Sequence, residues 1–202
     1  MCAMAEKRSG ETRAERSGLW ADARRRTVDS LTGLGKVRPL VLAATLLSIQ
    51  VVLGLVAAIP IGDYIRISFG YIALSMTAAL LGPAASMLNG ALADVIGFII
   101  HPTGPYFPGF TLTGVVSGAI YGYALYERPM TLRRIMLTKL VIDLFCNLIL
   151  NTLWLYLLYG KGFWVRLPAR ALKNLLQYPV DVAILYPFLT RIMPAARRDL
   201  DR

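Results

Sequence analysis

The chain has 202 residues, of which 56% are hydrophobic, and its mean hydropathy is +0.54. For such a composition the lipid bilayer, rather than a packed water-soluble core, is the expected solvent, which predicts an integral membrane protein. The formal net charge of +10 fits attraction to anionic lipid headgroups better than a nucleic-acid partner. Cys2 and Cys146 are too few and too far apart for a disulfide framework or a metal site, so redox chemistry is not indicated.

Residues 1–37 are predicted to form a basic cytoplasmic tail that is disordered or associated with lipid. Nine Lys or Arg residues lie between residues 1 and 38, without sustained apolar periodicity. No short apolar run with a small-residue cleavage site follows these charges, so the segment does not read as a signal peptide. Residues 38–193 are predicted to form the transmembrane domain, and residues 194–202 a cytoplasmic C-terminal tail.

The apolar segments predict an all-α bundle of six transmembrane helices, because a span needs about 17–25 apolar residues. The predicted spans are Pro39–Ala58, Tyr64–Leu81, Pro83–Ile100, Phe110–Tyr126, Ile135–Tyr159 and Leu172–Met193. Short loops rich in Lys and Arg stay in the cytoplasm, which puts both termini and the connection containing Arg128, Arg133 and Arg134 inside. The outer connections are then Ile59–Asp63, His101–Gly109 and Gly160–Ala171.

The last outer connection breaks the charge rule. It carries Lys161, Arg166 and Arg170, while Lys173 and Arg66 lie at nearby outer helix ends. These cations could simply extend to outer headgroups, and the aromatic residues among them could belong to an interfacial belt. Together, however, cations and flat aromatic side chains suit a planar anionic small molecule, which they would hold by stacking and by charge-assisted hydrogen bonds.

Two spans carry polar stripes at helical spacing. The fifth span has Asp143, Asn147, Asn151 and Trp154 on one face, and the sixth has Asn174, Tyr178 and Asp181. Polar groups at lipid depth usually face the bundle interior, so two such stripes would form a pocket open to the outside. Hydrogen bonding between helices is the competing explanation, and it is favoured for Asp181 and for Asp94 in the third span. Lys139, four residues before Asp143, is expected to neutralise that carboxylate, and the role of Gln50 stays open.

Motifs for an enzyme or an autonomous pump are missing from the sequence. It contains no phosphate-binding loop, no H-E-x-x-H, no G-x-S-x-G and no detectable repeat of two halves. His101 is the only histidine, so metal binding is not expected; its Pro- and Gly-rich loop more plausibly caps a pocket. We therefore expect a binding subunit without a cofactor, and not an enzyme. The small residues Ala44 and Ser48 could dock a partner or pack within the bundle.

Four stretches of the chain resemble the folate-specific substrate-binding (S) components of energy-coupling factor (ECF) transporters, the FolT family. They are YIRISFG from Tyr64, GPAASMLNGALADVIGF from Gly82, YFPGFTLTGVVSGAIYG from Tyr106 and LNTLWLYLLYGKGFWVRLPARALKN from Leu150. The resemblance covers roughly residues 38–192, and the fourth stretch is the most similar to the folate subgroup. The long basic tail is not part of the family core.

The resemblance implies a six-helix component that captures folate outside the cell membrane of a prokaryote. It would then dock on the membrane scaffold protein EcfT, which carries the ATPases EcfA and EcfA′, and topple to release folate inward. The family's docking motif Ala-x-x-x-Ala corresponds here to Ala44 and Ser48. A pterin would stack on Trp154 or Tyr178 and bond to Asn147, Asn151 and Asn174. The aminobenzoate-glutamate end would meet Arg66, Arg170 and Lys173.

Two alternatives to a folate-specific S component stay open from the sequence alone. The chain could be an S component for a queuosine precursor, riboflavin or a pyrimidine precursor, although a ligand without carboxylates would leave the outer cations unexplained. It could also be a membrane enzyme or an assembly factor that merely anchors a basic tail to lipid. In that case deletion of residues 1–35 should abolish function, whereas a vitamin-capture protein should still bind its ligand.

Overall fold

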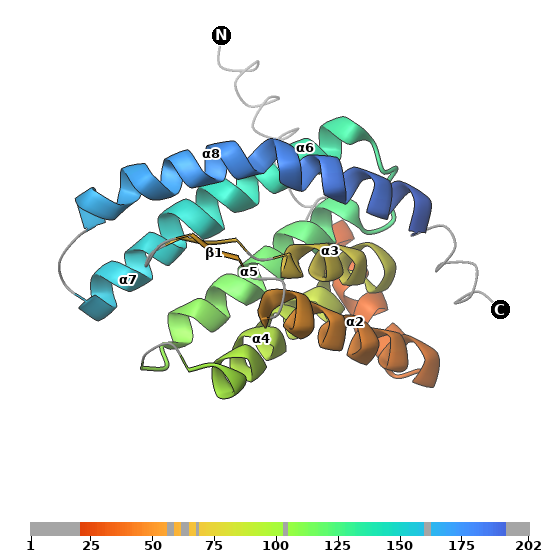
Figure 1. Cartoon of the computed structure of the whole chain (residues 1–202). Coiled ribbons are helices and arrows are strands. Elements are labelled where there is room, and N and C mark those ends of the chain that lie inside the picture. Colours follow the sequence, from red (N-terminus) through yellow and green to blue (C-terminus); the bar gives the residue numbers. More distant parts are fainter. Residues whose placement is uncertain are drawn as a thin grey trace, which may run out of the picture.

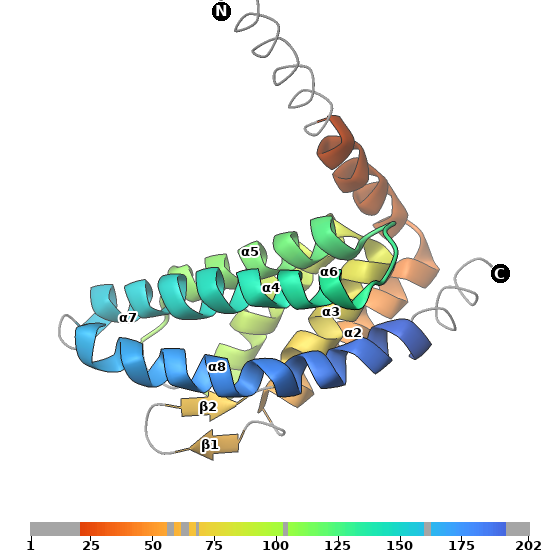
Figure 2. The same ribbon diagram turned by 90° about the horizontal axis from the view of Figure 1, so that it is seen from above.

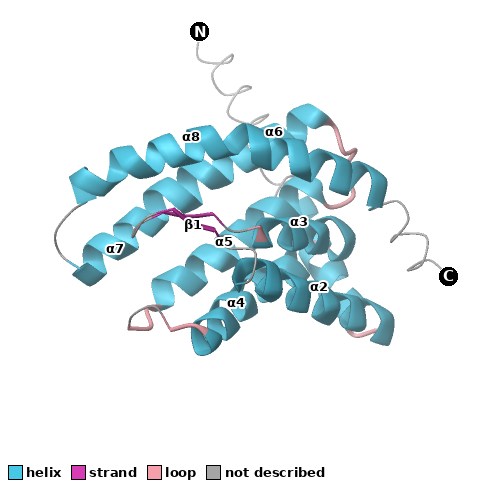
Figure 3. Cartoon of the chain, in the orientation of Figure 1, coloured by secondary structure: helices cyan, strands magenta, loops and turns pink. Residues whose placement is uncertain are grey.

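The computed structural model describes residues 21–55, 59–61, 65–67, 69–102, 105–159 and 163–192. For residues 59–61, 65–67, 159, 163–173 and 192 it describes the backbone alone. Helices make up nearly all of the described chain, as the colouring of Figure 3 shows. The prediction of an all-α membrane protein is confirmed, with one short antiparallel hairpin that the sequence did not predict.

The elements follow one another as a chain of helices interrupted only by this hairpin. A helix covers residues 21–34 and is followed by α2 (Val37–Leu55), β1 (Ile59–Ile61), β2 (Ile65–Ile67), α3 (Gly70–Leu81), α4 (Pro83–Ile100), α5 (Pro108–Leu125), α6 (Leu132–Ile142), the π-helix η1 (Asp143–Leu150), α7 (Asn151–Tyr159), α8 (Phe163–Pro187) and the π-helix η2 (Phe188–Ile192). Because α6, η1 and α7 are continuous, they form one long helix beside α8 (Figures 1 and 2).

Helices α4 and α5 form a tightly packed hairpin. Each begins with a proline at its first position, where the missing N–H removes no helical bond. Glycines then allow the two backbones to approach closely, since a Cβ on Gly90 would overlap the backbone of Gly114, and a Cβ on Gly118 would overlap that of Ser86. The hydroxyl of Ser86 donates to the carbonyl oxygen of Gly118 at 2.8 Å, which fixes the register of the pair.

The second and sixth predicted spans have different bounds in the structure. The second was expected to begin at Tyr64, but Ile65–Ile67 pairs as a strand with Ile59–Ile61, and the helix starts only at Gly70. The β-branched isoleucines of this segment favour the extended conformation. The sixth begins at Phe163 instead of Leu172, because the segment after Gly162 is rich in helix-forming Leu, Ala, Arg and Lys. Arg166 and Arg170 therefore lie on the first turns of α8 and not in a loop.

Three helical segments are long and apolar enough to cross a membrane within the described residues. They are Val37–Leu55, Pro83–Ile100 and Leu132–Leu158, and the shorter helix Gly70–Leu81 is also apolar. These segments are consistent with insertion into a membrane. The number of six spans stays a prediction.

Candidate binding cavity

The helices enclose a cavity of about 730 Å³, within the size range of pockets for small organic ligands. Side chains from α2, α3, α4, α5, the long α6–η1–α7 helix and α8 line it. One end is rich in charged and amide side chains of η1 and α8, and the other is covered by aromatic residues at the start of α5. The cavity therefore offers hydrogen-bonding groups at one end and apolar surface at the other.

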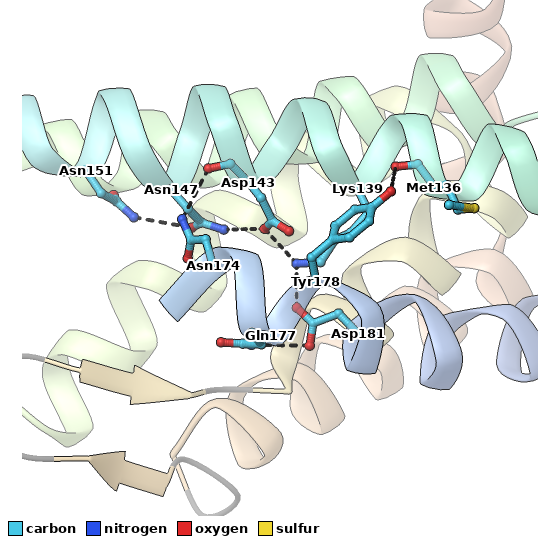
Figure 4. Close-up of polar contacts among 9 residues, drawn as sticks. All are labelled: Met136, Lys139, Asp143, Asn147, Asn151, Asn174, Gln177, Tyr178 and Asp181. Carbon is cyan, nitrogen blue, oxygen red and sulfur yellow. Dashed lines mark hydrogen bonds and ion pairs between the residues drawn. The ribbon is translucent and has the colours of Figure 1, made fainter. Parts of the chain in front are cut away.

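A buried ion network forms the polar end of the cavity (Figure 4). The Nζ of Lys139 lies 2.8 Å from Oδ1 of Asp143 and 2.9 Å from Oδ2 of Asp181. All three side chains are at most 9% exposed. The Lys139 ammonium also lies 4.5 Å from the ring centre of Tyr71. The expected pairing of Lys139 with Asp143 is confirmed, and Asp181 is a structural partner as predicted, although sequence alone did not identify Lys139 as its partner.

An amide ladder continues from this network along the long helix (Figure 4). Asn147 donates to Asp143 Oδ1 at 2.9 Å, and Asn151 donates to Asn147 Oδ1 at 3.5 Å. From α8, Asn174 donates to the backbone carbonyl of Asp143 at 3.4 Å. All three asparagines line the cavity, so the two predicted polar stripes do meet there. A carboxamide has two donor hydrogens and two acceptor lone pairs, and these bonds use only part of that capacity.

Further polar atoms along the cavity are buried without a hydrogen-bond partner among the described residues. They include Oε1 of Gln50, Oη of Tyr121 and Oε1 of Gln177. A buried polar group without a partner costs about 1–3 kcal/mol, so such atoms beside a cavity indicate a ligand that completes their bonds. Sequence reasoning left Gln50 open and missed the other two, since a tyrosine or glutamine at helical spacing does not reveal which way it points.

An aromatic wall closes the opposite side of the cavity. Phe107 and Phe110 line it, with ring centres 6.2 Å apart, and the Trp154 ring packs at a tilt behind Phe107, with ring centres 5.6 Å apart. The Trp154 indole donates to Oγ1 of Thr113 at 2.9 Å. Trp154, which the sequence proposed as a stacking surface, is therefore outside the described lining and supports Phe107, a residue that sequence reasoning did not single out.

The loop that joins α4 to α5 lies over this aromatic end. His101, Pro105 and Phe107 line the cavity, as expected for a capping loop. The loop is tied to α4 through Thr111, whose hydroxyl pairs with Tyr106 Oη at 2.7 Å and donates to Asp94 Oδ2 at 2.7 Å. Within the described residues no group of three His, Cys, Asp or Glu side chains could hold a metal.

The remaining predicted site residues are not among those that line the described cavity. The hydroxyl of Tyr178 donates to the carbonyl of Met136 at 3.0 Å, and this residue is not among those lining the cavity (Figure 4). Arg66 lies in β2, opposite Pro60. Arg170 and Lys173 lie on the first half of α8. The side chains of these three cations are outside the described part of the chain, so their role stays a prediction.

The small-residue strip of α2 faces outward. Ala44 and Ser48 are exposed, and the Ser48 hydroxyl donates to the carbonyl of Ala44 at 2.9 Å. The buried side chains of the helix, Ala43 and Leu46, lie on its other face. Of the two predicted uses of this strip, the structure is compatible with docking of a partner, whereas the bundle itself packs on the opposite face.

A helical membrane protein whose described part holds a chamber that is polar at one end and capped by a loop at the other has the features of a membrane-embedded receptor for a small molecule. Residues 38–189 match the family model described as ECF transporter, substrate-specific component. The chain therefore belongs to the family of substrate-specific components of ECF transporters.

Two relatives of this chain are both described as folate transporters. The "Folate transporter FolT" of Clostridium novyi is 38% identical over 60% of this chain and 71% of its own length. The "Folate transporter FolT" of Leuconostoc mesenteroides subsp. mesenteroides is 33% identical over 74% of this chain and 83% of its own length. A crystal structure of FolT bound with folic acid is similar in fold, with a TM-score of 0.68, 34% identity, and coverage of 75% of this chain and 92% of that one.

Proposed function

We propose that this chain is the folate-capturing subunit of an ECF-type importer in the cell membrane of a prokaryote. The cavity carries the proposal, because it combines buried polar atoms without partners and an aromatic wall in a fold similar to that of FolT bound with folic acid. The chain would cross the membrane six times, with both termini in the cytoplasm. The domain would span residues 38–193, between a basic N-terminal tail and a short C-terminal one.

The chemistry of folate suits the two ends of the cavity. Its pterin ring is flat and has several hydrogen-bond donors and acceptors, which match the amides of Asn147, Asn151 and Asn174 and the free oxygen atom of Gln50. The Phe107 and Phe110 rings offer apolar contact to the middle of the ligand. The glutamate carboxylates would then meet the cations Arg66, Arg170 and Lys173. Trp154 would contribute by holding Phe107 in place.

Delivery into the cell would require partner proteins. By analogy with the family, the exposed strip at Ala44 and Ser48 would dock on the scaffold EcfT, and the ATPases EcfA and EcfA′ would drive release. Small side chains favour this role because they let helix backbones approach closely in lipid. Co-purification of the complex, with Ser48→Trp as the disrupting variant, tests the docking surface separately from ligand binding.

Calorimetric titration of the detergent-purified, ligand-free protein tests the substrate. Folic acid, 5-formyltetrahydrofolate, riboflavin and a deazaguanine would be compared on the same preparation. We expect one-to-one binding of the folates alone. If folded protein binds no folate, the substrate assignment is wrong, and a response to riboflavin or the deazaguanine would replace the substrate while keeping the family.

Arg170 gives a specific test of the proposed carboxylate end. Arg170→Ala should weaken folate binding by about 1.5–3 kcal/mol, because a charge-assisted pair would be lost. This corresponds to a roughly 10- to 150-fold higher Kd. Arg191→Ala, at the other end of the same helical segment and exposed, is the matched control and should leave the Kd unchanged. Equal affinities of the two variants would remove Arg170 from the site.

A further inference from the structure

The helix of residues 21–34 lies outside the part of the chain that matches the family model, yet it packs on the bundle. Ser30, which is 2% exposed, donates to the carbonyl of Leu81 and accepts from the N–H of Ala85 at 3.3 Å. Thr27 pairs with the hydroxyl of Tyr123 at 2.9 Å. These contacts fix one face of the helix against α3, α4 and α5, so its opposite face has a defined orientation.

This helix lies at the end of the bundle away from the capping loop. Its contacts are at the turn between α3 and α4 and at the end of α5, whereas the capping loop joins the other ends of α4 and α5. In Figure 2 the helix, drawn in red-brown, runs obliquely to the long α6–α7 helix instead of following it. The ends of membrane-spanning helices lie near the membrane surface, so a helix packed on those ends is also placed near that surface.

The outward face of this helix and of the turn that follows it is basic and partly apolar. The helix itself carries Arg24, Arg25 and Arg26 with two Asp residues, while Lys36 lies in the turn and Arg38 at the start of α2. Both aspartates are paired, Asp22 with Arg26 at 3.0 Å and Asp29 with Arg25 at 3.6 Å. Val28 and Leu31 are 48% and 56% exposed. Cations beside exposed apolar side chains are the pattern of helices that lie in an anionic lipid interface.

A second segment adds charge to the same place. Arg26 donates to the carbonyl of Tyr126 at 3.4 Å, which brings the connection of residues 126–134 next to the helix. The exposed cations of the helix, of the turn into α2 and of this connection form what we call the basic end surface: Arg24, Arg25, Lys36, Arg38, Arg128 and Arg133. Segments about 100 residues apart in the sequence therefore contribute to one positively charged surface.

We propose that the basic end surface binds anionic phospholipid headgroups, with Val28 and Leu31 inserted among the lipids beside them. Lipid is the occupant because the surface combines cations with apolar side chains on a helix packed at the ends of the apolar helices. An acidic soluble protein would need the cations but not the exposed apolar pair. The surface thereby anchors the N-terminal segment at the membrane, independently of the ligand that the cavity holds.

Quenching by spin-labelled lipids tests this proposal on the full-length chain. A fluorophore is attached at Val28→Cys in a Cys2→Ser background, in which Cys146 is buried. The protein is placed in lipid nanodiscs that contain spin-labelled phosphatidylglycerol or spin-labelled phosphatidylcholine. We expect several-fold stronger quenching by phosphatidylglycerol, since each basic side chain at an anionic surface favours the contact by about fivefold.

Charge variants give the matched control. The triple variant R24Q/R25Q/K36Q should lose the preference for phosphatidylglycerol, and R24K/R25K/K36R should keep it. A fluorophore at Leu137→Cys, an exposed position of α6, should report the same quenching in all three proteins and so verify insertion. Equal quenching of wild type by the two lipids, or a preference that survives in the Gln variant, overturns the proposal. The proposal is also overturned if the fluorophore at Val28→Cys is protected from quenching by aqueous iodide only when a soluble partner protein is added.

Discussion

At the scale of single residues, Lys139 holds together the polar end of the cavity. Its ammonium is shared by two buried carboxylates, those of Asp143 and Asp181. Lys139→Met would leave both carboxylates buried without a cation, which costs about 3–5 kcal/mol. We expect a large fall in the unfolding temperature of the detergent-purified protein, measured by intrinsic fluorescence, with a loss of ligand binding that follows it.

A double variant separates loss of the ion pair from loss of packing. Lys139→Met combined with Asp181→Asn removes one of the two uncompensated charges, and it should be more stable than Lys139→Met alone. If the loss of stability in the double variant instead equals the sum of the losses in the two single variants, Lys139 and Asp181 do not interact energetically. Their proximity would then contribute nothing to stability.

Tyr121 is a second informative residue, because its hydroxyl is buried beside the cavity without a partner in the described chain. Tyr121→Phe removes a polar atom that no described residue satisfies, so stability should stay the same or rise slightly. If the ligand bonds to this hydroxyl, the Kd for folic acid should rise by about 2- to 10-fold. Calorimetric titration measures the change directly.

Thr152 supplies the matched control for Tyr121. Its hydroxyl is also buried without a partner among the described residues, but Thr152 is not among the residues lining the cavity. Thr152→Val should therefore leave the folate Kd unchanged while having a similarly small effect on stability. Equal affinities for wild type and Tyr121→Phe would mean that the ligand does not use the Tyr121 hydroxyl.

At the scale of elements, the α4–α5 hairpin depends on the absence of side chains at its contact. A Cβ on Gly118 would overlap the carbonyl oxygen of Ser86, and backbone cannot move aside as a flexible side chain can. Gly118→Ala should destabilise the protein by about 1–3 kcal/mol through overpacking. Gly33→Ala, in the helix of residues 21–34, has open space around it in the described chain and should be neutral or slightly stabilising. Thermal unfolding of both variants gives the comparison.

Between residues 38 and 193, sequence periodicity was sufficient for most elements and failed at two of them for identifiable reasons. The span beginning at Pro83 was predicted with its observed bounds, since Gly82 and Pro83 mark its start. Gly82 has a φ of 89°, a conformation that suits glycine. The segment Ile65–Ile67 was assigned to a helix because hydropathy does not distinguish a short apolar strand from the first turn of a span. Positive charge alone suggested a loop where α8 already begins.

At the scale of the whole molecule, the sequence predicted which site residues share a face of one helix, but not how the helices contact one another. Helical spacing placed Asp143, Asn147 and Asn151 on one face, and the structure puts that face on the cavity. Contacts between helices were not predictable, because spacing does not reveal rotation about the helix axis. For this reason the ion pair of Lys139 with Asp181, and the position of Trp154 behind Phe107, emerged only from the fold.

The fold also separates the cavity from the N-terminal helix, and a truncation tests this separation. The described cavity lining includes none of residues 21–34, whose contacts lie at the opposite end of α4 and α5. Deletion of residues 1–35 should therefore leave the folate Kd within about twofold of wild type. It should lower the unfolding temperature, because the two hydrogen bonds of Ser30 are lost, at about 0.5–1.5 kcal/mol each. Ser30→Ala in the full chain should reproduce part of this loss without changing the Kd. A more than tenfold loss of affinity in the folded truncated protein would show that the N-terminal segment takes part in binding, and would favour a function that resides in the basic tail over one that resides in the cavity.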